Sequence, residues 1–210
     1  MSPTTPTSPI LRVEQLGCER DERILFRDLA FQACAGEIWQ VAGANGTGKT
    51  TLLRILAGLH GFHDGRVRWQ VPGARHASAH DQILFLGHLA GLREELTAQE
   101  NLRWLCALHD QPAAMIPAAL SAVGLAGYDD APVATMSAGQ KRRVALARLW
   151  LPGKAVWILD EPFTAIDATG VEMIEQRLRK QAAAGTLVIY TSHHRLATDT
   201  RQIHLGGQGA

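Results

Sequence analysis

A glycine-rich run near the start of the chain has the residue types and spacing of a phosphate-binding loop. It matches G-x-x-x-x-G-K-[ST] and consists of Gly43, Ala44, Asn45, Gly46, Thr47, Gly48, Lys49 and Thr50. Glycines let the backbone wrap closely around phosphate oxygens, the lysine reaches the β- and γ-phosphates, and the last hydroxyl binds Mg²⁺. A plain glycine turn is the alternative. A predicted strand, 37–42, precedes the loop and a predicted helix, 50–59, follows it, so the context favours nucleotide binding.

Two neighbouring carboxylates follow an apolar run later in the chain. Residues 156–159 are typical of a short buried strand, and Asp160 and Glu161 come directly after it. In hydrolases with this kind of loop, an acid in this place helps to hold Mg²⁺, which is the role expected for Asp160. Glu161 can position or deprotonate the water that attacks the γ-phosphate. A pair of exposed acids without a function is the alternative, which the upstream loop disfavours.

A histidine follows another predicted strand, 187–191. His193 could hydrogen-bond the γ-phosphate and stabilise the charge that develops on it. Parallel sheets bind ligands at the edge where their strands end, which favours this role over a structural one. His194 is the weaker candidate. With Lys49 and Glu161, His193 completes the set of candidate catalytic residues.

Residues 136–148 have the features of half a binding site. Ser137 and Gln140 have the spacing of a capping box, and Val144, Ala147 and Leu151 recur at helical spacing. The backbone N–H groups of such a helix start favour an anion, phosphate above all. An ordinary capped surface helix is the alternative. We interpret the basic residues of this segment as a solvated helix face, and not as a nucleic-acid patch; they are Lys141, Arg142, Arg143 and Arg148.

The remaining patterns indicate how these segments are positioned. Strands are predicted at residues 11–16, 25–33, 37–42, 66–71, 156–159, 187–191 and 202–205, and helices at 50–59, 116–123 and around 171–178. Strands that alternate with helices predict an α/β fold with a mainly parallel sheet. We expect a disordered tail at 1–9, which lacks the features of a secretory signal, and a single domain at 10–210 with a helical subdomain at about 87–151.

Composition limits the function further. Of the 210 residues, 46% are hydrophobic and 20% are charged, which is typical of a globular protein. The net charge is only +1, so electrostatics gives no argument for binding to nucleic acid. Cys18, Cys34 and Cys106 form no CxxC pair, so we expect small buried residues and neither zinc nor a disulfide framework. Prolines and glycines interrupt the uncharged stretch 111–128, so any membrane role is expected to come through a partner.

Taken in this order, the segments resemble the nucleotide-binding subunits of ABC transporters over nearly the whole chain past the tail. The resemblance implies an ATPase with a P-loop NTPase core, a mainly parallel sheet, a small antiparallel β region and a helical subdomain. It implies a homodimer that encloses two ATP molecules with Mg²⁺. Each ATP would contact residues 43–51 of one subunit, Thr51 included, and Ser137, Gly139 and Gln140 of the other. Residues 164–167 would cross the dimer interface.

Two positions depart from the family pattern. Arg20 stands near the end of the first strand, where an aromatic residue usually stacks on adenine; a guanidinium can also stack there, or Arg20 can belong to a solvated charged turn. His88 stands where a glutamine usually contacts Mg²⁺ and faces the membrane partner. It can still make one hydrogen bond, but with a different geometry.

Segments 18–23, 86–88, 137–151 and 157–167 resemble the ATP-binding subunits of the bacterial haem exporters for cytochrome c maturation. This implies a peripheral subunit on the cytoplasmic face of the inner membrane, paired with integral membrane subunits that we expect to dock at 87–101. It would drive haem delivery through, or release of, a periplasmic haem chaperone, without binding haem or nucleic acid itself. The alternatives are the ATPase of another small transporter, a non-transport ABC protein acting on nucleic acid, and a binding module that does not hydrolyse ATP.

Overall fold

The computed structural model describes residues 10–61, 63–71, 79–109, 111–151 and 153–206. Over these residues the chain folds as two compact units. The first comprises the part up to Phe85, residues 154–160 and the part from Arg179 onward; the second comprises Leu86–Gly153 and Glu161–Leu178. The expected tail at 1–9 lies outside the described residues.

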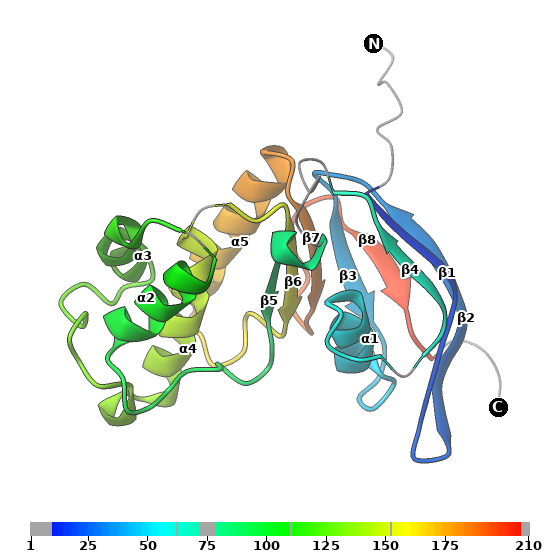
Figure 1. Cartoon of the computed structure of the whole chain (residues 1–210), viewed down its shortest axis with the longest axis horizontal. Helices are drawn as coiled ribbons and strands as arrows, with labels where there is room; N and C mark the ends of the chain where they lie inside the picture. Colours follow the sequence, from blue (N-terminus) through cyan, green and yellow to red (C-terminus); the bar gives the residue numbers. More distant parts are fainter. Residues whose placement is uncertain (1–9, 62, 72–78, 110, 152, 207–210) are drawn as a thin grey trace, which may run out of the picture. The chain divides into compact units, whose positions relative to one another are not determined.

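A five-stranded sheet forms the centre of the first unit (Figure 1). Its strands, in spatial order, are β5 (Ile83–Leu86), β6 (Val156–Asp160), β7 (Leu187–Thr191), β3 (Ile38–Ala42) and β8 (Arg201–His204). β6 runs parallel to β7, and β3 runs parallel to both β7 and β8. Every residue of β6 and β7 is buried, as in strands covered on both faces. The predicted mainly parallel α/β fold is therefore confirmed.

A smaller antiparallel sheet completes the β structure of this unit. β1 (Leu11–Arg20) pairs with β2 (Arg23–Ala33) on one side and with β4 (Asp64–Trp69) on the other. Asp21 and Glu22 join β1 to β2 with positive φ angles of 51° and 61°, the backbone of a tight hairpin turn. The first strand is thus longer than the predicted 11–16, because the charged residues after it continue the ladder up to the hairpin.

The first helix of this unit, α1 (Lys49–Leu56), ends earlier than its apolar pattern predicts. Gly58 adopts a left-handed φ of 71°, its N–H donates to the carbonyl of Ile55, and the N–H of Leu59 donates to that of Arg54. These two bonds form a Schellman motif, which stops a helix. The buried side chains of α1 join a core with residues of both sheets: Leu11, Val13, Leu16, Phe26, Val41, Leu52, Leu53, Leu56, Ile158 and Ile189.

The second unit is helical. It contains α2 (Ala98–Leu108), α3 (Ile116–Ala122), α4 (Ala138–Ala147) and the first part of α5 (Ala168–Ala183), and Figure 1 shows α2, α3 and α4 in shades of green. Short 3₁₀ turns η2 (Ala113–Met115), η3 (Val133–Thr135) and η4 (Arg148–Trp150) connect them; η1 (Ala79–Gln82) precedes β5 in the first unit. Leu102, Leu120 and Val144 belong to a core of its own.

Several local predictions differ from the structure. The sequence pattern does not predict β5, a strand of four residues. Cys18 and Cys106 are buried as expected, whereas Cys34 is only half-buried and its N–H donates to Glu37. Within the described residues, no helix has both the length and the apolar character needed to cross a membrane.

Candidate functional site

The phosphate loop leads from β3 into α1 and is held by its own residues. Lys49 Nζ donates to the carbonyls of Gly43 and Ala44 at 2.8 and 3.0 Å, and Thr47 Oγ1 donates to the carbonyl of Ala44 at 2.9 Å. Gly48 has a φ of 94°, and a Cβ added there would lie 2.9 Å from Leu25 Cβ. The loop therefore requires glycine at this position on two grounds, backbone conformation and space.

The tip of the loop is open. Ala44, Asn45 and Gly46 are exposed, while Thr51 is half-buried on α1. The amine of Lys49 lies at main-chain carbonyls, which a long and flexible side chain can leave when an anion offers a stronger partner. The arrangement fits a loop that receives phosphate oxygens on its backbone N–H groups.

Asp160 joins this loop to the middle of the parallel sheet. Its Oδ2 accepts from Thr50 Oγ1 at 2.9 Å, and its Oδ1 accepts from Thr191 Oγ1 at 2.7 Å. Asp160 is 2% exposed and Thr191 is fully buried. The structure thus brings Thr50 and Asp160 together, as expected of two Mg²⁺ ligands. A hydroxyl and a carboxylate are hard oxygen donors, the set that suits this ion.

Glu161 is the first residue of the later segment of the second unit, and its backbone is unusual. Its φ is +50°, a left-handed conformation that is uncommon for residues other than glycine. Its carbonyl accepts from Arg142 Nη2 at 2.7 Å and from the N–H of Thr164 at 3.2 Å. The main chain directly after the buried strand β6 is therefore held by specific donors.

His193 lies just past the end of β7 and is exposed. The residue before it is anchored, because Gln40 Nε2 of β3 donates to the carbonyl of Ser192 at 2.9 Å. The N–H of His194 donates to Ser192 Oγ at 2.9 Å. The strand end that carries His193 is thus tied to the strand that leads into the phosphate loop.

The predicted capping box at the start of α4 is present. Ser137 Oγ accepts from the N–H of Gln140 at 3.2 Å, and Gln140 Oε1 accepts from the N–H of Ser137 at 2.9 Å. Ser137 is exposed, and a Cβ on Gly139 would come no closer than 3.5 Å to the carbonyl of Ala165. The capping bonds use the Ser137 hydroxyl as an acceptor, so its O–H can donate outward.

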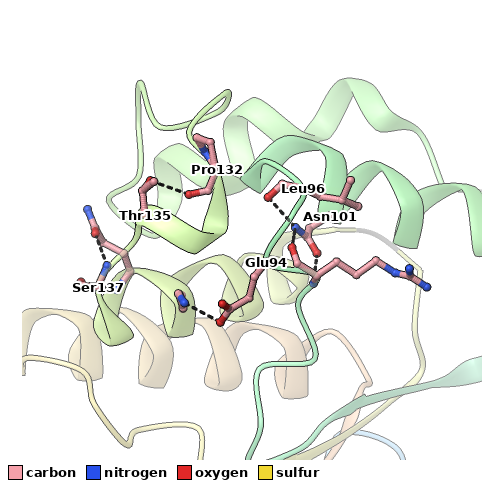
Figure 2. A network of polar contacts seen from close by, with 9 residues as sticks. Glu94, Leu96, Asn101, Pro132, Thr135 and Ser137 are labelled. Carbon is pink, nitrogen blue, oxygen red and sulfur yellow. Dashed lines mark hydrogen bonds and ion pairs between the residues drawn. The ribbon is translucent and has the colours of Figure 1, made fainter.

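A network of polar contacts shapes the segment before α2 (Figure 2). The buried side chain of Asn101 accepts from the N–H of Arg93 at 2.8 Å and donates to the carbonyls of Arg93, Leu96 and Thr97. Lys141 of α4 pairs with Glu94 at 2.7 Å. The segment therefore has a fixed shape although it contains no regular element.

The interpretation of the α4 basic residues as a solvated face is wrong. Arg142 is buried, Lys141, Arg143 and Arg148 are half-buried, and burial lowers the pKa of Arg148. Lys141, Arg142 and Arg143 find partners within the second unit: Arg143, for example, donates to the carbonyl of Val123 and pairs with Asp167 at 2.5 Å. Tertiary partners, which local sequence cannot show, explain the difference.

The two residues that depart from the family pattern, Arg20 and His88, are both exposed. Arg20 lies at the exposed end of β1 and pairs with Asp21 at 3.3 Å. The side chain of His88 is exposed, while its carbonyl accepts from Arg142 Nη1 at 3.3 Å. The sequence indicates neither the contact of Thr191 with Asp160 nor that of Arg142 with the carbonyl of Glu161. For Thr191, the signal is a hydroxyl at the end of an otherwise apolar strand.

Comparison with known proteins agrees with this geometry. A sequence model described as ABC transporter matches residues 26–164, which include the phosphate loop, the α4 capping box and the Asp160–Glu161 pair. This chain belongs to the ABC transporter family. The chain is therefore a nucleotide-binding protein and an ABC-type ATPase.

Among ABC relatives, the chain is similar to two proteins named cytochrome c biogenesis ATP-binding export protein CcmA. The one from Alcanivorax borkumensis is 58% identical over 195 residues, covering 93% of this chain and 87% of the relative. The one from Vibrio cholerae is 52% identical over 206 residues, covering 94% and 99%. A solved ATP-binding subunit of an ABC transporter superposes with a TM-score of 0.81 at 22% identity, covering 95% of this chain and 89% of that one, and supports the ABC fold.

Proposed function

We propose that this chain is the ATPase subunit of a haem export complex for cytochrome c maturation. It would power haem delivery through a periplasmic haem chaperone, or the release of that chaperone. The hydrogen-bonded Thr50–Asp160–Thr191 set beside the phosphate loop carries the argument for ATP hydrolysis. The names of relatives more than 50% identical over nearly the whole chain support the export role.

In this proposal each site residue has a separate task. Residues 43–51 bind the phosphates of ATP, and Lys49 leaves its carbonyl partners to contact the β- and γ-phosphates. Thr50 and Asp160 would hold Mg²⁺, and the ion would supply positive charge against the phosphates. Glu161 deprotonates the attacking water, and His193 stabilises charge on the γ-phosphate. Arg20 would stack on adenine, and His88 would make one hydrogen bond at the Mg²⁺ site.

The other half of each ATP site would come from a second copy of the chain. The Ser137 hydroxyl, the N–H of Gly139 and the amide of Gln140 would then contact the γ-phosphate held by the partner subunit. Support comes from the exposed, capped start of α4, which favours an anion. The γ-phosphate would bridge the two copies, and hydrolysis would remove that bridge.

Integral membrane subunits would dock at residues 87–101. This segment has a shape fixed by Asn101 and Lys141, and it presents Leu89, whose side chain is 81% exposed. Docking there would place the chain on the cytoplasmic face of the inner membrane as a peripheral subunit. Residues 10–210 would act as one ATPase domain with the helical part at about 87–151, and neither haem nor nucleic acid would bind the chain directly.

The hydrolysis proposal is tested with Glu161→Gln. We expect ATP turnover to fall roughly 10²–10⁴-fold, with an ATP-bound dimer that accumulates on size-exclusion chromatography. Glu172→Gln is the matched control, because Glu172 is an exposed glutamate of α5 that pairs with Gln176. Turnover that Glu161→Gln leaves unchanged would remove Glu161 from the reaction.

The export proposal is tested by affinity purification from detergent-solubilised membranes. We expect integral membrane subunits and a haem-loaded periplasmic chaperone to co-purify with the chain. Recovery of membrane subunits without haem would favour the ATPase of another small transporter. Recovery of nucleic acid without membrane subunits would favour a non-transport ABC protein.

A further inference from the structure

Arg142 is a buried arginine whose side chain contacts main-chain carbonyls from two other segments of the second unit. Its Nη1 donates to the carbonyls of Gly87 and His88 at 3.1 and 3.3 Å, and its Nη2 donates to that of Glu161 at 2.7 Å. Only 6% of Arg142 is exposed. The planar guanidinium presents its donors in a fixed fork, so these contacts set the spacing between the two segments.

The backbone that Arg142 holds at Glu161 is in a sparsely populated conformation. A φ of +50° at a glutamate persists only where the surroundings determine it. The 2.7 Å bond from Arg142 is shorter than the 3.2 Å bond that the same carbonyl accepts from the N–H of Thr164. If the bond from Arg142 were lost, the peptide could rotate and the carboxylate of Glu161 would point elsewhere.

Arg142 also belongs to the helix whose N-terminus is the candidate anion site. It lies three residues after Gly139 on α4, so the two share one face of the helix, one turn apart. A shift of α4 on binding phosphate at Ser137–Gly139 would therefore move the guanidinium and, through it, the main chain of Glu161.

We propose that Arg142 is the positioning residue for Glu161: it sets the direction of the general-base carboxylate and ties it to the position of α4. The inference rests on the proposed function of Glu161. Arg142 does not touch the reacting atoms itself. It acts through the carbonyl of Glu161, and its second contact holds the main chain at Gly87 and His88.

The test compares Arg142→Lys and Arg142→Gln in the full-length chain. Lysine keeps the buried charge, but a single ammonium cannot serve both groups of carbonyls as the guanidinium fork does. We expect the rate constant for ATP hydrolysis, measured under single-turnover conditions, to fall about 10²-fold in both variants, because a displacement of about 1 Å at a catalytic group has an effect of this size. The dissociation constant for ATP is expected to stay unchanged.

Arg177→Gln is the matched control. Arg177 lies in the same unit and donates from Nε to the carbonyl of Leu149 at 2.8 Å, so this variant also removes a bond from arginine to main chain. We expect wild-type turnover from it. Melting temperatures of all variants separate lost stability from lost positioning, and the lysine variant keeps the test available if the glutamine variant does not fold.

A double-mutant comparison distinguishes positioning from a general structural role. If Arg142 acts through Glu161, the Glu161→Gln/Arg142→Lys double variant hydrolyses ATP no more slowly than Glu161→Gln alone. If the double variant is slowed by the sum of the two single effects, the inference is overturned. A wild-type rate of hydrolysis in Arg142→Lys would overturn it too. Wild-type turnover in Glu161→Gln would instead overturn the proposed function, so the two failures are distinguishable.

Discussion

The hydroxyl of Thr50 donates a 2.9 Å hydrogen bond to Asp160 Oδ2, although 110 positions separate the two residues in the sequence. Thr191 completes the set with a 2.7 Å bond to the other carboxylate oxygen. The start of α1 and the ends of β6 and β7 are therefore joined by one buried carboxylate. The phosphate loop of this ABC ATPase rests on the sheet through this contact.

We expect Thr191→Val to destabilise the protein. Valine has nearly the shape of threonine but no hydroxyl, so Oδ1 of Asp160 would lose its buried donor, at a cost of about 1–3 kcal/mol. Urea denaturation measures the loss. Thr135→Val is the control, because Thr135 is exposed and its hydroxyl donates to the carbonyl of Pro132. A Thr191→Val protein as stable as the wild type would contradict the importance of this bond.

Like α4, α2 begins with a capping box: Thr97 Oγ1 accepts from the N–H of Glu100 at 3.1 Å, and Glu100 Oε2 accepts from the N–H of Thr97 at 2.8 Å. Comparing the two boxes separates stability from catalysis. Ser137→Ala and Thr97→Ala each remove an N-cap, at a cost of about 0.5–2 kcal/mol. Only Ser137→Ala should also lower ATP turnover, because only Ser137 is proposed to contact nucleotide. Denaturation and ATPase assays on both variants make the comparison. Equal turnover in the two would contradict the role of Ser137.

The trans arrangement makes a further prediction for mixed dimers. In a dimer with one Ser137→Ala subunit, only the ATP bound by the other subunit's loop should be hydrolysed slowly. Pairing this variant with Lys49→Ala in the same or the opposite subunit, and measuring residual ATPase activity, tells the cases apart. Identical residual activity in both pairings would exclude a contact across the dimer.

Gly48→Ala is expected to damage the phosphate loop. Alanine disfavours a φ of 94°, and its Cβ would lie 2.9 Å from Leu25 Cβ. We expect weaker ATP binding by titration and a lower melting temperature. Gly61→Ala is the matched control, because no atom lies within 4 Å of a Cβ built there. Normal ATP affinity in Gly48→Ala would show that the loop tolerates a side chain at this position.

Glu100 gives the helical unit a specific response to acid. Hydrogen bonds from Thr97, the backbone N–H first, hold the pKa of this exposed carboxyl below its usual range. Its stabilising effect is therefore present above the usual glutamate pKa and is lost as the pH falls through the lowered value. We expect Glu100→Gln to be destabilising at about pH 7 and less so at about pH 3. Urea midpoints at the two pH values test this, and an equal difference at both would contradict it.

The sequence predicts the parts of this molecule that depend on local signals. The phosphate loop, the Ser137–Gln140 box and the strand 187–191 are each read from a few neighbouring residues, and the structure has all three. The roles of the site residues stay predictions. β5 is not predicted, because four consecutive apolar residues show neither strand nor helix periodicity. The early end of α1 is not predicted either, because it depends on the turn at Gly58.

The burial of Arg142 is a feature that could not be predicted from the sequence. By its type and its basic neighbours Arg142 is typical of a solvated helix face. Its partners, the carbonyls of Gly87 and Glu161, lie 55 and 19 residues away. Whether a charged residue is buried depends on such distant acceptors, and no local pattern contains them.

The left-handed backbone of Glu161 has a consequence for how this position can vary. A glutamate at φ +50° is destabilised by about 1–3 kcal/mol relative to an unstrained residue, whereas asparagine tolerates this conformation better. Replacement by asparagine would relieve the backbone strain. It would also replace the carboxylate by a neutral amide, which cannot take a proton from water. Stability and activity are therefore opposed at this residue, so a screen for thermostable variants would tend to select inactive ones here.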